Sequence, residues 1–184
     1  PRKGDWDNIL ALYLHVVNNV KYARDVPVPI PPTVDELISG RFSREFRWDY
    51  VQSPLITLSL RQGDCDDMTI LLYAMIKAWQ KYVYGKEYTL WLMLIEMNDG
   101  IGHAAVASPV EGGRISILDP AGEYYTGTPG RYRSEDPYTE LRRYSDRWSD
   151  EHGGIKRIVI YNPTTGEKVV EGDIYTVAQF IKTR

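Results

Sequence analysis

The sequence contains one cysteine, Cys65, among its 184 residues. A single cysteine excludes an internal disulfide, and the lack of a Cys-x-x-Cys pair removes the spacing typical of structural zinc sites. The 22 basic residues do not outnumber the 25 acidic ones, and the net charge of -3 argues against a general nucleic-acid binder. No run approaches the ~20 consecutive apolar residues that span a membrane.

No signal peptide is visible, and the chain begins with Pro1 rather than Met. This indicates a processed form or a piece of a larger protein, so a cytoplasmic and an extracytoplasmic origin both stay open. The length suits one domain with a sizeable core, and the sequence has no internal repeat. We therefore expect residues 1–184 to form a single domain, with its oligomeric state undetermined.

The first part of the chain, about residues 1–45, is expected to be mostly helical. Apolar residues recur at helical spacing in residues 5–24, which predicts an amphipathic helix. The proline-rich run 26–32 cannot be helical and predicts an extended connector. Thr33, with Glu36 three residues later, has the pattern of a capping box and predicts the start of a short helix.

A nearly all-round apolar segment follows Asp64 and extends to about Gln80, which predicts a helix central to the core. Asp64 is suited to cap this helix, and Cys65 then lies in its first turn. Runs rich in β-branched and aromatic residues predict strands at 88–96, 101–108, 114–118 and 158–161. A central helix followed by antiparallel strands indicates an α+β fold.

Residues 121–154 are polar, glycine-rich and tyrosine-rich, and they separate the core, about 46–120, from a last core strand at 155–162. Four residues within this segment have the spacing of one amphipathic helix: Tyr138, Leu141, Tyr144 and Trp148. We expect most of the segment to be a solvated insertion, and a lid over the functional site is the alternative.

Three residues have the chemistry of a thiol nucleophile with its base and orienting acid: Cys65, His103 and Asp119. The unpaired N–H groups at a helix start favour the thiolate, which is the nucleophilic form of cysteine. A histidine can hold an ion pair with the thiolate and then protonate a leaving amine. A carboxylate on the far ring nitrogen fixes the tautomer, and facing side chains on neighbouring strands can make that hydrogen bond.

Each of these residues also has a simpler interpretation. A lone cysteine in a helix is usually inert packing, a strand histidine can be a satisfied core residue, and an aspartate before a proline is most often a turn former. Asp64, Asp66 and Asp67 can be an ordinary charged first turn, and their negative charge opposes the thiolate. A metal site built from these six residues is a third interpretation, which the absence of closely spaced ligand pairs disfavours.

Three motifs resemble those of the transglutaminase-like superfamily, with its papain-like core, and in particular its prokaryotic members. They are Gly63-Asp64-Cys65-Asp66-Asp67, Gly102-His103-Ala104 and Leu118-Asp119-Pro120, preceded by Tyr50-Val51-Gln52-Ser53-Pro54. The resemblance covers about residues 45–120, with the motifs in the family's order. It implies a papain-like α+β fold in which the cysteine opens a central helix packed on an antiparallel sheet.

Carried over residue by residue, the resemblance implies that Cys65 is the nucleophile. His103 is then the general base and acid, and Asp119 orients it. Asp67 matches the second acidic position of the cysteine motif, where a structural role in holding the helix start is expected.

The oxyanion of an acyl-transfer reaction needs hydrogen-bond donors. The resemblance implies the backbone N–H of Cys65 as one donor, and Gln52 is the candidate side chain, with Trp48 and Gln62 as alternatives. Two positions depart from the family: Ala105 stands where many relatives have an aromatic residue, and Thr69 where many have alanine. Both leave the three reacting groups in place.

The sequence therefore predicts a thiol enzyme that acts on amide bonds of a protein or peptide through a thioacyl intermediate. Water as the acceptor makes it a cysteine protease or amidase, whereas a lysine amine makes it a cross-linking transferase; the resemblance to compact prokaryotic members favours hydrolysis. No cofactor or metal is expected, and the lack of EF-hand spacing predicts no calcium requirement. The alternative is a non-catalytic peptide- or partner-binding module on the same fold.

Overall fold

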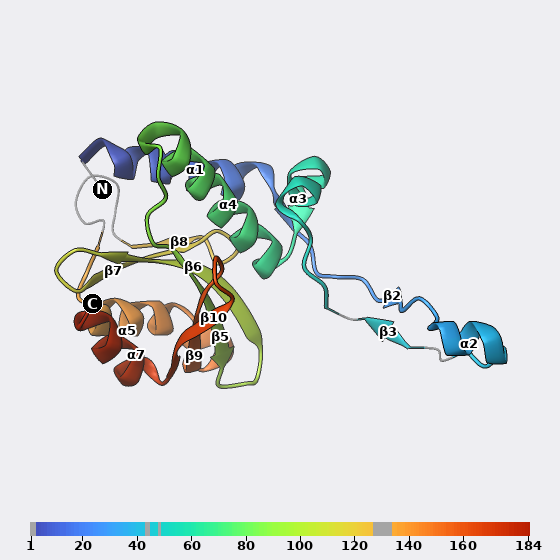
Figure 1. Cartoon of the computed structure of the whole chain (residues 1–184). Helices are drawn as coiled ribbons and strands as arrows, with labels where there is room; N and C mark the ends of the chain where they lie inside the picture. The colour runs from blue at the N-terminus through green and yellow to red at the C-terminus, as the bar shows by residue number, and fades with distance from the viewer. Residues whose placement is uncertain (1–2, 43–44, 48, 127–133) are drawn as a thin grey trace.

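A six-stranded antiparallel sheet forms the centre of the fold, with its strands in the order β10-β9-β5-β6-β7-β8 (Figure 1). The computed structural model describes residues 3–42, 45–47, 49–126 and 134–184. The strands are β5 (Trp91–Met97), β6 (Gly102–Val110), β7 (Arg114–Asp119), β8 (Tyr124–Tyr125), β9 (Ile155–Asn162) and β10 (Glu167–Gly172). The expected mixture of helices and an antiparallel sheet is confirmed.

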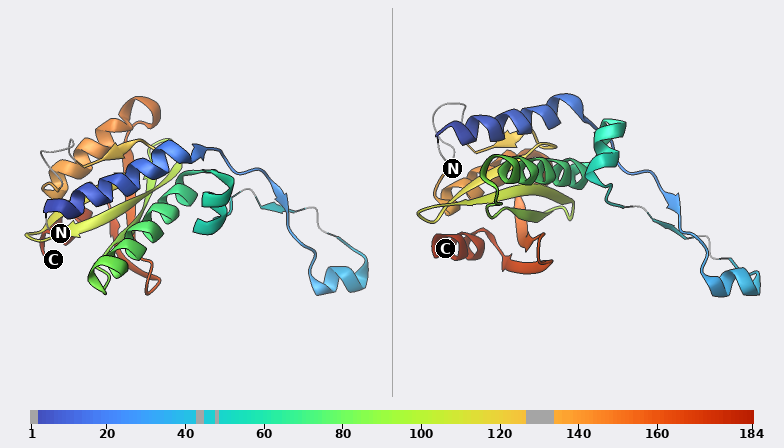
Figure 2. Two further views of the ribbon diagram at one scale, coloured as in Figure 1. Left: turned by 90° about the horizontal axis from the view of Figure 1, so that it is seen from above. Right: turned by 45° about the horizontal axis from the view of Figure 1, so that its top comes forward.

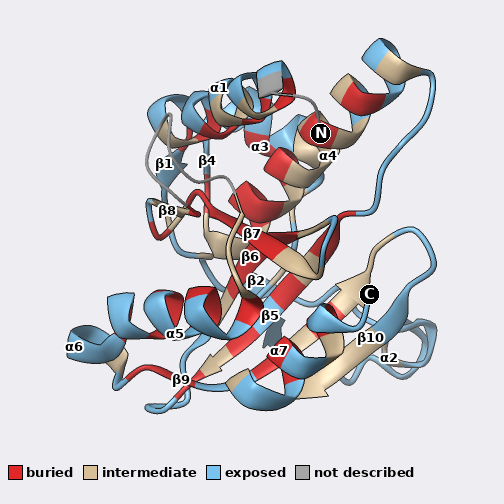
Figure 3. Ribbon diagram, turned by 90° about the vertical axis from the view of Figure 1, so that its left-hand side faces the viewer, coloured by how far each residue is buried: buried red, intermediate tan, exposed pale blue. Residues whose placement is uncertain are grey.

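Helices cover both faces of this sheet (Figures 1 and 2). One face carries α1 (Lys3–Asn19) and α4 (Cys65–Tyr84), and the other carries α5 (Pro137–Arg147) and α7 (Ile174–Lys182). Two apolar clusters result, one on each face, and Figure 3 shows the buried residues gathered along the central strands and the inner sides of the helices. No helix among the described residues is long and apolar enough to cross a membrane.

Side chains alternate between the two clusters along the central strands, as the pleat of a sheet requires. On β6, Val106 belongs to the cluster under α1 and α4, whereas Ala105 and Ala107 belong to the cluster under α5 and α7. The same alternation carries His103, two residues before Ala105, toward the side of α5.

The helix starts that the sequence predicts are present. Thr33 and Glu36 form the capping box of α2 (Val34–Ser39), with the Thr33 N–H donating to Glu36 Oε2 at 2.8 Å. The core helix α4 begins at Cys65 directly after Asp64. Its end lies past the expected Gln80, because Gly85 supplies the left-handed conformation that closes the helix.

A helix that the sequence analysis did not expect is α3 (Pro54–Leu60), which lies between the proline-rich segment and α4. Ser53 caps it and Pro54 occupies its first turn, an arrangement favourable at helix starts. A short parallel pair, β1 (Lys21–Tyr22) with β4 (Gln62–Gly63), then brings the chain after α1 alongside the cysteine motif.

The described residues 26–42, 45–47 and 49, which we call the arm, project away from the sheet (Figures 1 and 2). Strands β2 (Val28–Pro29) and β3 (Phe46–Arg47) pair along it, and α2 forms its tip. At its base the Tyr50 N–H donates to Asp25 Oδ2 at 2.6 Å. None of the residues of α2 is buried.

The expectation that residues 121–154 form mostly a solvated insertion is wrong for the part that the structure describes. Strand β8 pairs with β7, and Leu141 and Tyr144 of α5 are fully buried. The predicted helical spacing is confirmed, with Tyr138 exposed and Trp148 buried at the helix end before α6 (Ser149–His152). Residues 127–133, also in this segment, lie outside the described residues.

Candidate active site

Cys65 is the first residue of α4 and its side chain is half-buried. The backbone N–H groups of a helix's first turn have no acceptor within the helix, so they present positive charge to a thiolate at this position. Asp64, just before the helix, is extended and donates its backbone N–H to Asp67 Oδ2 at 3.3 Å.

Asp67 ties this helix start to the segment before α3. Its carboxylate is fully buried and accepts two hydrogen bonds from Gln52, from the backbone N–H and from Nε2, each at 2.6 Å. Burial raises the pKa of Asp67, and the backbone donor of Gln52 opposes that rise. A side chain at Gly63 would lie 2.6 Å from Asp67 Cβ, so the glycine permits this close approach.

Gln52, the candidate oxyanion donor, therefore lies beside Asp67. One hydrogen of its Nε2 is directed to that carboxylate, which leaves the second hydrogen for another acceptor. Its Oε1 is buried and has no hydrogen-bond partner among the described residues. Of the alternative donors, Trp48 lies outside the described residues, and Gln62 is an exposed residue of β4.

Thr69, one turn after Cys65, fixes α4 to the sheet. Its buried hydroxyl donates to the carbonyl oxygen of Ala104 at 3.0 Å. Because Ala104 follows His103 on β6, this bond brings the first turn of α4 to the start of the strand that carries the histidine. The Thr69 hydroxyl thus has a defined partner.

His103 and Asp119 lie on neighbouring strands and form a hydrogen bond of 2.8 Å between Nε2 and Oδ2. Asp119 is fully buried and the His103 side chain is 10% exposed. Burial lowers the pKa of His103, but hydrogen bonds with Asp119 and with Cys65 outweigh it and raise the pKa to about 10. The imidazole is consequently a cation at neutral pH, placed between the carboxylate and the thiol.

Two further groups hold the carboxylate of Asp119, and a third packs on the imidazole. The Gly122 N–H donates to Asp119 Oδ1 at 2.8 Å, and the Tyr144 hydroxyl donates to Oδ2 at 2.7 Å. The indole of Trp148 packs on the imidazole of His103, with ring centroids 4.7 Å apart. The sequence around Asp119-Pro120 predicts a turn, which is where Gly122 lies. Tyr144 and Trp148 reach the site only because the fold packs α5 against the sheet.

Acidic side chains crowd the other side of Cys65. Burial, a hydrogen bond that protonated Asp66 donates to Asp64, and the charges of Asp64 and Asp67 raise the pKa of Asp66 to about 8. The possible ligand atoms of Asp64, Cys65 and Asp66 lie within 4.8 Å of one another, as do those of Asp25, Asp49 and Asp64. Such clusters are common without an ion, and we assign no metal to them.

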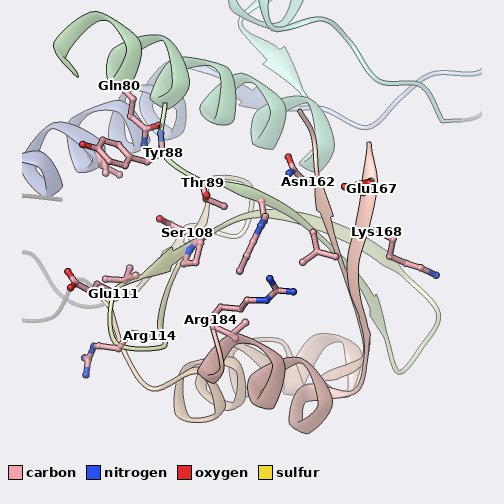
Figure 4. A pocket seen from close by; sticks show the side chains of 16 residues that line it. Gln80, Tyr88, Thr89, Ser108, Glu111, Arg114, Asn162, Glu167, Lys168 and Arg184 are labelled. Carbon is pink, nitrogen blue, oxygen red and sulfur yellow. Dashed lines mark hydrogen bonds between the residues drawn. The ribbon is translucent and has the colours of Figure 1, made fainter. Parts of the chain in front are cut away.

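A cavity of about 980 Å³ lies at the end of the sheet opposite to Cys65, His103 and Asp119 (Figure 4). It is lined by Gln80 near the end of α4, Ser108 near the end of β6 and Arg114 at the start of β7. The three triad candidates lie at the other ends of these same elements, so this cavity is separate from them.

No protein-family model matches the chain, and the search of curated proteins found no match. Solved structures of Legionella pneumophila LapG resemble it loosely. Calcium-bound LapG is 19% identical with a TM-score of 0.43, over 73% of this chain and 62% of LapG. EGTA-treated LapG is 16% identical with a TM-score of 0.45, over 100% of this chain and 79% of LapG.

In the calcium-bound structure and in a further LapG structure, the chain spans about three fifths of LapG's length. TM-scores below 0.5 do not establish a shared fold. The function proposed next therefore depends on the side chains of this molecule.

Proposed function

We propose that this chain is a thiol-dependent acyl-transfer enzyme that acts on amide or peptide bonds, with Cys65, His103 and Asp119 as its triad. The observation that supports it most is the hydrogen bond of 2.8 Å between His103 Nε2 and Asp119 Oδ2. It leaves the other ring nitrogen for Cys65, whose hydrogen bond is one cause of the raised pKa of His103. This arrangement supports a cysteine nucleophile with a histidine base and an orienting carboxylate.

In the proposed reaction the thiolate of Cys65 attacks the carbonyl carbon of a substrate amide. The resulting oxyanion is held by the backbone N–H of Cys65, with Gln52 as the candidate second donor. The His103 imidazolium protonates the departing amine as the carbon–nitrogen bond breaks, which leaves a thioester on the sulfur. An acceptor then attacks the thioester, and His103 takes its proton and returns the enzyme to its starting state.

We propose water as the acceptor, which makes the protein a cysteine protease or amidase, because the motifs resemble those of compact prokaryotic members of the superfamily. A peptide library and a fluorescent primary amine test this together. Wild-type protein should release peptide fragments, and the Cys65→Ser variant should not. Incorporation of the amine without fragment release would instead make the protein a cross-linking transferase.

The arm supports a second candidate, a partner-binding module on the same fold. It carries large exposed apolar residues on α2 and beside it, namely Val34, Leu37, Ile38 and Phe42. Such surfaces commonly mark interaction sites. If this candidate is right, Ile38→Asp should abolish capture of the partner while Cys65→Ser leaves the capture unchanged.

A further inference from the structure

We propose that Tyr144 is a positioning residue of the triad, because its hydroxyl fixes the carboxylate of Asp119 against His103. This inference rests on the proposed function. Tyr144 comes from α5, which follows Asp119 in the chain and lies outside the three motifs. It acts through Asp119 and is not expected to touch the substrate.

The hydroxyl of Tyr144 and the imidazole of His103 share one oxygen of the carboxylate. Tyr144 Oη donates to Asp119 Oδ2 at 2.7 Å, and His103 Nε2 lies 2.8 Å from the same atom. The other oxygen, Oδ1, accepts the Gly122 N–H at 2.8 Å. Both oxygens are therefore anchored, and the carboxylate cannot rotate away from the imidazole without breaking a hydrogen bond.

The burial of Asp119 makes these donors necessary. The carboxylate has no exposed surface, and a buried charge is costly unless donors surround it. Tyr144 supplies one of the three donors, so it helps to keep Asp119 ionised beside the imidazolium. Loss of the donor weakens the Asp119–His103 pair and, through it, the proposed ion pair of His103 with Cys65.

The position of the Tyr144 ring is itself well determined. The ring is fully buried, and it packs against Tyr124 with centroids 4.8 Å apart and against Trp148 at 6.4 Å. Tyr124 is held in turn by the buried carboxylate of Glu140, to which its hydroxyl donates at 2.6 Å. Burial and the charge of Asp119 raise the pKa of Tyr144 well above its usual range, so the hydroxyl stays a donor.

The test compares the rate of iodoacetamide alkylation of Cys65 against pH in wild type, Tyr144→Phe and Tyr138→Phe. Tyr138 is on the same helix and exposed, so it is the matched control. We expect Tyr144→Phe to lower the rate near pH 6 about tenfold, the effect of losing a hydrogen bond to a charged group, and Tyr138→Phe to leave it unchanged. 4-Fluorophenylalanine at position 144, which fills the hydroxyl's volume without donating, replaces the phenylalanine variant if that variant does not fold.

A lowered melting temperature with an unchanged pH profile means that Tyr144 is merely structural, and this overturns the inference. A wild type that is unreactive at low pH contradicts the proposed function instead. In that case the NMR resonance of the proton between His103 Nε2 and Asp119 tests the positioning role of Tyr144 separately. Tyr144→Phe should shift that resonance if the hydroxyl positions the carboxylate, and an unmoved resonance overturns the inference.

Discussion

At the scale of single residues, charges of opposite sign surround Cys65. His103 offers a positive charge on one side, stabilised by the buried carboxylate of Asp119. On the other side Asp66 lies among carboxylates that repel one another. The thiolate form therefore depends on the imidazolium outweighing the acidic cluster.

We predict that His103 remains protonated well above neutral pH. Its pKa in the folded state is about 10, against about 6.5 for an unperturbed histidine. The stabilisation from its charge is therefore complete below pH ~6.5 and is lost as the pH rises through ~10. Titration of the imidazole resonances by NMR measures this directly, and a midpoint near 6.5 would contradict the geometry described for the triad.

Stability is predicted to fall with rising pH for Asp66 as well, because its pKa of about 8 in the folded state exceeds the ordinary value for an aspartate. The folded protein should lose stability as the pH rises from ~4 to ~8, because the folded state must release a proton that the unfolded state has already lost. Asp66→Asn should raise the free energy of unfolding at pH 8 by roughly 1–2 kcal/mol, a figure discounted for solvent screening.

Urea denaturation at several pH values measures the Asp66 effect, with EGTA present so that no divalent cation contributes. Asp150→Asn, at an exposed position, is the control and should have no effect. An Asp66→Asn protein no more stable than wild type at pH 8 would show that repulsion between Asp66 and its neighbouring carboxylates does not destabilise the folded state.

We also predict that Gly122 tolerates no side chain. A Cβ at this position would lie against Asp119 Oδ2 and 2.6 Å from Trp148 Cζ2. Gly122→Ala should lower the free energy of unfolding by about 1–3 kcal/mol, as overpacking does, and should slow Cys65 alkylation at pH 6. Gly4→Ala, where nothing lies within 4 Å, should leave both measurements near wild type; equal behaviour of the two variants would refute the prediction.

At the scale of elements, the site depends on the join between α4 and β6. The start of α4 positions Cys65, and the start of β6 positions His103. The Thr69 hydroxyl connects helix and strand by its hydrogen bond to the Ala104 carbonyl. Helix α5 packs on the opposite face and supplies Tyr144 to Asp119. The triad candidates thus meet where elements from both faces reach the same end of the sheet.

Thr69→Val keeps the shape of the side chain and removes the hydroxyl. We predict a loss of about 1–2 kcal/mol in the free energy of unfolding, because a buried acceptor loses its donor, together with slower alkylation of Cys65 at pH 6. Thr89→Val, at an exposed position, is the control. Unchanged alkylation in Thr69→Val would show that this bond does not set the position of the thiol.

The sequence predicts the core elements well because their signals are local. Asp64 before an apolar run marks the start of α4, and runs rich in β-branched and aromatic residues mark β5 to β7. Helix α3 is not predicted, since most of its apolar residues face outward and carry no helical stripe. The segment after residue 121 is misjudged because its polar composition conceals the inward spacing of Leu141 and Tyr144.

The triad candidates are predicted from motifs, but the groups that hold them are not. Nothing in the local sequence links Tyr144 or Trp148 to Asp119 or His103, because those contacts arise only when α5 packs on the sheet. The contact of Gln52 with Asp67 likewise depends on α3 packing beside α4.

At the scale of the whole molecule, the sheet with its four covering helices and the arm are different kinds of structure. The sheet is packed on both faces, whereas the tip of the arm buries nothing (Figures 1 and 3). We predict that Ile38→Asp, at a residue 79% exposed, leaves the free energy of unfolding within about 0.5 kcal/mol of wild type.

Leu71→Ala provides the contrast for that variant, because Leu71 lies in the core beneath α1. Loss of the Leu71 side chain should lower the free energy of unfolding by about 2–5 kcal/mol, because it leaves a cavity. Chemical denaturation compares the two proteins, and a large loss in Ile38→Asp would mean that the arm packs in solution against some part of the molecule.

The pH dependence of Cys65 alkylation in wild type and His103→Ala tests the central claim most directly, with His15→Ala as an exposed control. The account predicts that wild type and His15→Ala react readily well below the ~8.5 pKa of a free thiol. His103→Ala should lose this reactivity at low pH. An unreactive Cys65, or one that titrates as an ordinary thiol in all three proteins, would contradict the proposed acyl-transfer site and favour the binding module.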